Sequence, residues 1–147
     1  MKHIVITGGA GFIGAHAAGH FLKDGWQVTV FDNLSHGHRA AVPAAARFVP
    51  GDINDRSAVA DLCASEKYDA VTHFAAYIEA GESMKDPGLF FHNNVGGALN
   101  VIEESVRRGT RKFVLSSSAA IFASSDAPLG EAAPLSPANV YGETKRM

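Results

Sequence analysis

The sequence contains a single cysteine, Cys63, among its 147 residues. A disulfide within the chain needs two cysteines, and a metal site built on several thiolates needs more than one, so both are excluded. The count alone does not exclude a reactive thiol. The letters around it, VADLCASE, have a helical pattern, and a cysteine in such a helix is typically a small buried residue.

Runs of lysine or arginine are also lacking. The chain has 13 basic and 15 acidic residues, a formal net charge of -2 and a pI of about 6.4. Proteins that bind nucleic acid or an anionic membrane through charge concentrate basic residues on one surface, and no such concentration is present. We therefore expect no nucleic-acid partner and no membrane partner, and we favour small-molecule chemistry or protein contacts.

Long hydrophobic segments are missing as well. The first apolar run, MKHIVIT, meets glycines at once and is too short for a signal-peptide core or a membrane span. We therefore expect a cytoplasmic protein. With 46% hydrophobic and 19% charged residues, the composition fits one ordinary domain, and a chain of this length buries about two thirds of its unfolded surface.

Strand and helix patterns alternate along the chain. Strands are predicted at HIVIT, QVTVFD, ARFVPGDI, YDAVTHFAA and KFVLSSS, and helices after the first glycines, near 55–66 and over about 87–108. Gly25 is typical of a residue that ends the first helix. That helix is expected to place five apolar residues on one face: Phe12, Ile13, Ala17, Phe21 and Leu22.

The end of the chain is predicted to contain a loop and a short helix. ASSDAPLGEAAPLSPA is rich in Pro, Ser and Ala and is typical of a loop. Ser136 and Pro137 then fit the cap and first-turn residue of a last helix. Apolar strands that alternate with helices indicate a parallel sheet covered on both faces, so the predicted fold class is doubly wound α/β.

A glycine turn joins the first strand to the first helix. TGGAGFIG places Gly8, Gly11 and Gly14 three residues apart, where bare backbone lets a pyrophosphate approach the N–H groups at the helix start. Taken alone, the spacing is a weak signal that also fits a tight turn with close helix–sheet packing. The strand before the turn and the helix after it favour a dinucleotide site.

An acidic residue follows the second strand. Asp32 stands where dinucleotide-binding folds place a carboxylate that accepts hydrogen bonds from the adenosine ribose and repels an extra phosphate, which favours NAD over NADP. A turn-forming role beside Asn33 is the alternative. Arg39, with His36 and His38, leaves open a cationic site for a ribose phosphate.

Two histidines share one face of the first predicted helix. His16 and His20 are four residues apart in HAAGH, but the stretch contains neither a carboxylate ligand nor the glutamate of a metalloprotease motif. Solvated helix histidines are the better interpretation, and we predict no metal site.

Motifs spread over the whole chain show a family resemblance. ITGGAGFIG, FDNLSHG, GDI, HFAA, GESMKDP, NNVGGALNVIE, SSSAAIFA and YGETK occur in the order found in extended short-chain dehydrogenase/reductases. Within that group the chain resembles the NAD-dependent epimerase/dehydratase family, and more narrowly the UDP-glucose 4-epimerases. The resemblance implies a Rossmann-type NAD-binding domain over 1–147, cut before the last strands, with a C-terminal substrate domain absent from this chain.

The resemblance implies a cofactor site that runs along the predicted strand ends. Phe12 and Ile13 would lie along the pyrophosphate, 32–37 and 52–53 around the adenosine, 74–78 under the nicotinamide half, and Asn93 would add a polar contact. The implied cofactor-binding residues are Gly8, Gly11, Phe12, Ile13, Gly14, Asp32, Asn33, Leu34, Ser35, His36, Gly37, Asp52, Ile53, Phe74, Ala75, Ala76, Tyr77, Ile78, Asn93, Tyr141 and Lys145. Some relatives have lysine where this chain has Ile78.

The resemblance also implies a catalytic group. Tyr141 would remove the proton from the sugar 4-hydroxyl, Ser118 would hydrogen-bond that hydroxyl, and Lys145 would lower the pKa of the tyrosine and bind the nicotinamide ribose. Without the other motifs, a Tyr and a Lys four residues apart would be an ordinary surface pair. The implied substrate is a UDP-hexose, inverted at carbon 4 through a 4-keto sugar, and a homodimer is possible for a full-length protein.

Three departures bear on the reaction. Ala119 and Ala120 stand where related dehydratases carry an acidic pair, which argues against dehydration. Phe122 and Ala123 replace a Tyr and a Gly usual among the epimerases, so the sugar is less well indicated than the cofactor. The alternatives are another NAD-dependent nucleotide-sugar epimerase or reductase, and a non-catalytic NAD-binding module. We expect the 147-residue chain alone to be inactive.

Overall fold

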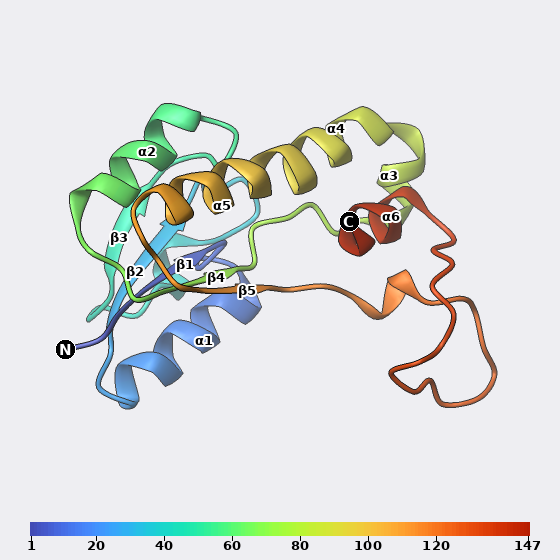
Figure 1. The fold of residues 1–147 in the computed structure, drawn as a ribbon, viewed down its shortest axis with the longest axis horizontal. Helices are drawn as coiled ribbons and strands as arrows, with labels where there is room; N and C mark the ends of the chain where they lie inside the picture. Colours follow the sequence, from blue (N-terminus) through green and yellow to red (C-terminus); the bar gives the residue numbers. More distant parts are fainter.

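The computed structural model describes residues 1–147 and contains one sheet with helices on both faces (Figure 1). Its five strands are β1 (His3–Thr7), β2 (Gln27–Asp32), β3 (Arg47–Pro50), β4 (Ala70–His73) and β5 (Lys112–Leu115). All neighbouring strands pair in parallel, in the order β3-β2-β1-β4-β5. The predicted doubly wound α/β class is confirmed.

Helices α1 (Phe12–Lys23) and α2 (Arg56–Ser65) confirm two of the predicted helices, and Gly25 follows α1 with a φ of 77°. The predicted long helix near 87–108 is present as α4 (Pro87–Phe91), a π-helical turn η2 (His92–Gly97) and α5 (Ala98–Arg107). The short helix α3 (Ala80–Lys85) was not predicted. Short 3₁₀ turns occupy η1 (Arg39–Ala41) and η3 (Ala119–Ile121).

Alternate residues of the strands enter two separate cores. Ile4 and Ile6 of β1 pack with Ala18 of α1 on one face of the sheet, whereas Val5 packs with Val59 of α2 and Val101 of α5 on the other. Successive strand side chains point to opposite faces, so a strand buried on both faces must be apolar throughout. Figure 1 shows the same division, with α1 on one side of the sheet and α2 and α5 on the other.

The predicted apolar face of α1 was partly wrong. Ala17, Phe21 and Leu22 pack against the core as expected, but the Phe12 and Ile13 side chains are 81% and 62% exposed. These two residues form the first turn of the helix, and they line a cavity instead of the core.

The predicted start of the last helix was also wrong. Helix α6 (Val140–Arg146) begins after Asn139, whose side chain accepts a hydrogen bond from the backbone N–H of Gly142. Ser136 and Pro137 precede the helix. The segment between Phe122 and Leu135 is a loop, as predicted, and an antiparallel bridge joins those two residues.

No helix in the structure has both the length and the apolar character needed to cross a membrane.

Candidate functional site

The glycine turn after β1 packs directly against the loop that follows β4. Gly8 has a φ of 70°, and a Cβ added to it would lie 2.5 Å from the backbone nitrogen of Ala75. A Cβ on Gly14 would lie 2.3 Å from the carbonyl oxygen of Gly8. Both positions therefore require glycine, and the turn presents bare backbone at the start of α1.

Asp32, at the end of β2, is bound to this turn. Its carboxylate accepts hydrogen bonds from the backbone N–H of Ala10 at 3.0 Å and from that of Leu34 at 2.7 Å. Leu34 has a φ of 59°, and this left-handed conformation is held by the carboxylate bond. A carboxylate has about four acceptor positions, so two remain for ligand hydroxyls.

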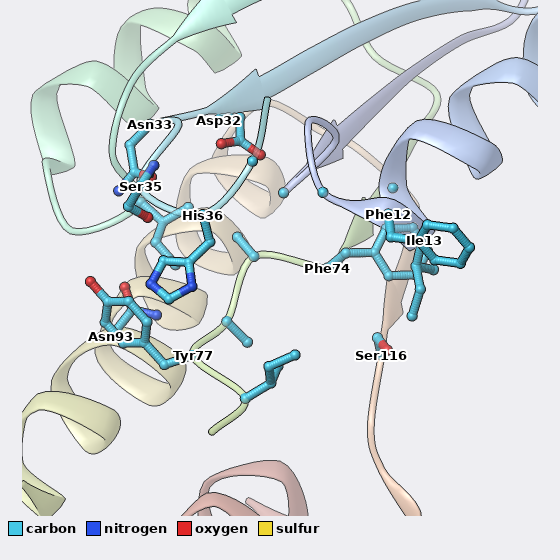
Figure 2. A pocket seen from close by; sticks show the side chains of 18 of the residues that line it. Phe12, Ile13, Asp32, Asn33, Ser35, His36, Phe74, Tyr77, Asn93 and Ser116 are labelled. Carbon is cyan, nitrogen blue, oxygen red and sulfur yellow. The ribbon is translucent and has the colours of Figure 1, made fainter. Parts of the chain in front are cut away.

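A cavity of about 700 Å³ extends along the carboxyl edge of the sheet. Figure 2 shows Asp32, Asn33, Ser35 and His36 gathered at one part of it, and Phe12, Ile13, Phe74 and Ser116 at another. The predicted site residues that line the cavity are Gly8, Gly11, Phe12, Ile13, Gly14, Asp32, Asn33, Ser35, His36, Gly37, Ile53, Phe74, Ala75, Ala76, Tyr77, Ile78, Asn93, Ser118, Tyr141 and Lys145.

Two predicted site residues do not line the cavity. Leu34 turns its backbone toward Asp32, as described above. Asp52 instead accepts hydrogen bonds from the side chain of Asn33 at 2.9 Å and from the backbone of Asn54 at 2.8 Å. Burial acts to raise the pKa of Asp52, but these bonds and one from the Asn54 amide outweigh it, so the pKa lies below its usual value. Asp52 therefore does not face the cavity but holds Asn33 and Asn54 in place through these hydrogen bonds.

The loops after β2 and β4 meet across the cavity. His36 Nδ1 lies 3.4 Å from Glu79 Oε1, and the rings of His36 and Tyr77 are 5.6 Å apart. The Tyr77 ring in turn lies 5.8 Å from that of Phe90 in α4. These contacts connect the loop that follows β2 to the loop that follows β4.

The far end of the cavity is built from the segment after β5 and from α6. The Nζ of Lys145 donates to the carbonyl oxygen of Ser116 at 2.9 Å, and Ser117 Oγ donates to the carbonyl oxygen of Lys145 at 2.9 Å. Lys145 is 8% exposed, and burial lowers its pKa. Ser118 lies three residues beyond β5, where its Oγ caps η3 by accepting from Ala120 N–H at 3.2 Å.

Buried polar side chains hold α6 in place. Ser83 in α3 is fully buried and its Oγ accepts from the backbone N–H of Tyr141 at 3.0 Å. Asn94 in η2 donates to Thr144 Oγ1 at 3.0 Å, and Thr144 donates to the carbonyl oxygen of Tyr141 at 2.7 Å. The side chains of Tyr141 and Lys145 thus face the cavity from a helix fixed at two points.

Sequence reasoning missed several residues of this site. Phe31, Gly51, Ser116 and Ser117 line the cavity. The run SSS after a strand gave a signal for the two serines, whereas nothing local distinguishes Phe31 or Gly51.

His16 and His20 of α1 are both exposed, as predicted. No group of three or more His, Cys, Asp or Glu side chains is placed to hold a metal ion.

The residues present fit a dinucleotide. The cradle at Gly8 and Gly14 is space that a side chain would fill, and it lies where a pyrophosphate would meet the helix start. Asp32 retains acceptor capacity for ribose hydroxyls at the β2 end. The same cavity is also lined by a cation, Lys145, and by the two hydroxyl-bearing residues Tyr141 and Ser118.

Comparison with known proteins agrees with the architecture. Residues 4–147 match the model of the NAD dependent epimerase/dehydratase family. The chain is 43% identical over 143 residues to the UDP-glucose 4-epimerase of Lacticaseibacillus casei, covering 97% of this chain and 43% of the relative. It is 38% identical over 157 residues to UDP-arabinose 4-epimerase 1 of Arabidopsis thaliana, covering 100% of this chain and 38% of the relative.

A solved structure, UDP-glucose 4-epimerase from Brucella ovis in complex with NAD, superposes with a TM-score of 0.94 at 38% identity. The match covers 99% of this chain and 45% of that one. The chain thus spans less than half the length of the relatives it matches.

Proposed function

The chain belongs to the NAD dependent epimerase/dehydratase family, and from that premise we propose that residues 1–147 form the NAD-binding part of an enzyme that inverts carbon 4 of a UDP-hexose. One observation carries the proposal. A single cavity is lined by the glycine cradle and Asp32 and also by Ser118, Tyr141 and Lys145.

The residues proposed to hold NAD are those that line the cavity. The glycine turn would receive the pyrophosphate, Asp32 the adenosine ribose, and Lys145 the nicotinamide ribose. Bound NAD would supply an acceptor that takes a hydride from carbon 4 and returns it to the opposite face. The positions of the NAD contacts stay predictions, supported by the match to a relative solved with NAD.

NAD is preferred over NADP in this proposal. The Asp32 carboxylate would repel a phosphate on the adenosine ribose. The guanidinium of Arg39, the cation that left this question open, lies 4.8 Å from the Phe48 ring and stacks there. Both observations support a ribose that carries free hydroxyls.

Tyr141 is the proposed proton carrier. A free tyrosine has a pKa of about 10, so its phenolate is scarce at neutral pH. The ammonium of Lys145, one turn further along α6, would stabilise negative charge that develops on the Tyr141 oxygen during proton transfer. Tyr141 would take the proton of the 4-hydroxyl and return it after inversion, while the Ser118 hydroxyl would hold that oxygen in place.

Epimerisation is favoured over dehydration because Ala119 and Ala120, in η3 beside Ser118, carry no carboxylate. A pentose substrate is the second candidate, since a UDP-arabinose 4-epimerase matches the whole chain at 38% identity. Phe122 and Ala123 differ from the Tyr and Gly usual among the epimerases, so the sugar is less well indicated than the cofactor.

Further expectations remain proposals. These are a separate C-terminal domain that holds the sugar, a cytoplasmic location and a homodimer of the longer enzyme. We also propose that the 147-residue chain binds NAD without turnover. Detectable epimerisation by the purified chain would refute that statement.

A chimera tests the catalytic proposal. Residues 1–147 are joined to the remaining portion of the Lacticaseibacillus casei relative and incubated with UDP-glucose, UDP-galactose or UDP-arabinose. Interconversion without net consumption of cofactor is expected, and Tyr141→Phe should lower kcat at least about 100-fold while NAD still binds. Full activity in Tyr141→Phe contradicts the role of the tyrosine. Net oxidation or reduction of added cofactor indicates a dehydrogenase or reductase instead, and NAD binding with no chemistry indicates a binding module.

A further inference from the structure

A chain of side-chain amides lies behind the cavity and connects its two ends. The Nδ2 of Asn54 donates to Asp52 Oδ1 and to Asn93 Oδ1, both at 2.9 Å. Asn93 Nδ2 donates to Asn94 Oδ1 at 3.0 Å. Asn94 then bonds the backbone of Tyr77, accepting from its N–H at 2.8 Å and donating to its carbonyl oxygen at 2.9 Å.

The direction of every amide in this chain is fixed from both ends. An ionised carboxylate only accepts, so the NH₂ group of Asn54 must face Asp52. At the other end, the backbone N–H of Tyr77 must face Asn94 Oδ1, and the backbone carbonyl oxygen of Tyr77 must face Asn94 Nδ2. Asn93 lies between, and the only arrangement that satisfies both neighbours has its oxygen toward Asn54 and its nitrogen toward Asn94.

This arrangement decides what Asn93 offers to a ligand. Its oxygen accepts from Asn54, and one of its two N–H groups bonds Asn94, which leaves one N–H. Asn93 lines the cavity, so that remaining donor is available to an acceptor atom of a bound molecule. With Asn93 reversed, the cavity would present a carbonyl oxygen and would repel the same atom.

The packing around Asn54 places its NH₂ group where it is needed. Gly97 of η2 lies against the loop, since a Cβ there would be 2.6 Å from the Ile53 side chain and 3.2 Å from Asn54 Oδ1. The Asn54 oxygen is buried without a hydrogen-bond partner. An unpaired buried oxygen is unfavourable, so the favourable contribution of this side chain comes from its two donors.

The same chain reaches the helix that carries Tyr141. Asn94 donates a second bond to Thr144 Oγ1, which in turn donates to the Tyr141 carbonyl oxygen. We propose that Asn54 is a positioning residue that orients the Asn93 amide as a donor toward the cofactor and links the adenosine end of the cavity to α6. The inference rests on the proposed function only in naming NAD as the ligand.

Amide exchange in the ligand-free chain tests the orienting role. The Asn93 side-chain N–H bonded to Asn94 and the backbone N–H groups of 140–146 should exchange at least about tenfold faster in Asn54→Ala. Asn54→Asp should produce an effect at least as large. Aspartate has the shape of asparagine, so a purely packing role predicts that Asn54→Asp behaves like the native chain, and that result would overturn the proposal.

Asn100→Ala is the matched control. Asn100 donates to the carbonyl oxygen of Ile53 at 3.0 Å, beside Asn54, but has no bond to the amide chain. In Asn100→Ala, the exchange rates of the Asn93 side-chain N–H and of the backbone N–H groups of 140–146 should stay within about twofold of those in the native chain. Equal acceleration by Asn100→Ala and Asn54→Ala would mean that any loss of a bond in this loop suffices, which would also overturn the proposal.

Calorimetry with NAD supplies the second measurement. Affinity should fall about tenfold in Asn54→Ala, at least as far in Asn54→Asp, and by less than about twofold in Asn100→Ala. Unchanged affinity in both Asn54 variants would overturn the claim that the donor faces the cofactor. If the native chain binds no NAD, the proposed function fails, while the exchange measurement still decides whether Asn54 orients Asn93.

Discussion

At the scale of single residues, the glycine turn shows how strictly the backbone is constrained. The hypothetical Cβ of Gly14 meets backbone atoms of Gly8 and Gly9 at 2.3 and 2.7 Å, and backbone cannot rotate away as a side chain can. Gly19, in the same helix, has no atom within 4 Å of the equivalent position. The two glycines therefore have opposite expected responses to alanine.

We expect Gly14→Ala to lower the free energy of unfolding by roughly 1–3 kcal/mol through overpacking, and to weaken NAD binding at least about tenfold because the start of α1 must move. Gly19→Ala should raise the free energy of unfolding by up to about 1 kcal/mol, since alanine favours helix over glycine. Urea denaturation and calorimetry measure both. Equal responses at the two positions would contradict the close packing described for the turn.

His73, the last residue of β4, is the second residue with a measurable consequence. It is 1% exposed, its Nδ1 lies 2.7 Å from Thr7 Oγ1, and its ring is stacked 6.1 Å from that of Phe113. Burial, with a smaller effect from the charge of Lys145, lowers the pKa of His73 to about 4. The folded protein therefore keeps this imidazole neutral at pH values where an unfolded chain would protonate it.

Stability should fall on acidification through that window. Between pH 6.5 and pH 4 the unfolded chain binds a proton at His73 that the folded chain does not bind. The contribution of His73 to the free energy of unfolding is therefore fully present above pH 6.5 and is lost as the pH falls toward 4. The loss is about 3 kcal/mol. His73→Asn retains a partner for Thr7 and cannot titrate, so its unfolding free energy should fall less over the same range.

The difference between the native and His73→Asn curves isolates this effect, because His3, whose pKa burial also lowers, is present in both proteins. Parallel curves from pH 7 to 4 would show that His73 titrates alike in the folded and unfolded chains.

At the scale of elements, α6 is positioned by tertiary contacts more than by its own sequence. Seven residues form a marginal helix by themselves, and packing must stabilise it. Asn139 caps it, Ser83 binds the N–H of Tyr141, and Lys145 bonds Ser116. The Ser-Pro pattern at 136–137 satisfies a local rule for a helix start, but these distant partners set the start at Val140.

Asn139→Ala should therefore lower the free energy of unfolding by about 1 kcal/mol and speed exchange at the N–H of Gly142. Ser136→Ala is the control. It should change the free energy of unfolding by less than about 0.5 kcal/mol and the exchange rate of the Gly142 N–H by less than about twofold. Hydrogen exchange with mass spectrometry over 136–147 distinguishes the two. A larger effect from Ser136→Ala than from Asn139→Ala would indicate that the helix begins at Ser136 and Pro137, as the sequence predicted.

Other features separate what local sequence can predict from what it cannot. The strands, α1 and α2 follow from apolar periodicity, because that pattern reflects burial directly. Asp32 could be found from its spacing after the glycine turn. Asn54 could not, since its partner Asn93 lies 39 residues away and only the fold brings them together. The π-helical turn η2 also has no period in the sequence that distinguishes it from α-helix.

At the scale of the whole molecule, strand order explains where the cavity lies. From β1 the chain proceeds outward through β2 to β3, then returns to place β4 on the other side of β1 and continues to β5. In parallel sheets of this kind, ligands bind beyond the carboxyl ends of the strands where the order reverses. The contact of Gly8, after β1, with Ala75, after β4, marks that point.

The same topology brings residues from the whole chain into one site. The glycine turn and Asp32 come from the first quarter of the sequence, and Tyr141 and Lys145 come from its last helix, α6. Their meeting depends on all five strands being parallel and in this order. The NAD binding that we propose for the chain therefore requires the complete arrangement of the sheet.

Isothermal titration calorimetry of the 147-residue chain with NAD and with NADP tests this account most directly. We expect one NAD to bind per chain. The affinity for NADP should be at least about tenfold lower, because its extra phosphate meets the Asp32 carboxylate. Asp32→Ala should reduce this difference in affinity between NAD and NADP. Absence of saturable heat with either dinucleotide, or tighter binding of NADP by the native chain, would contradict the account.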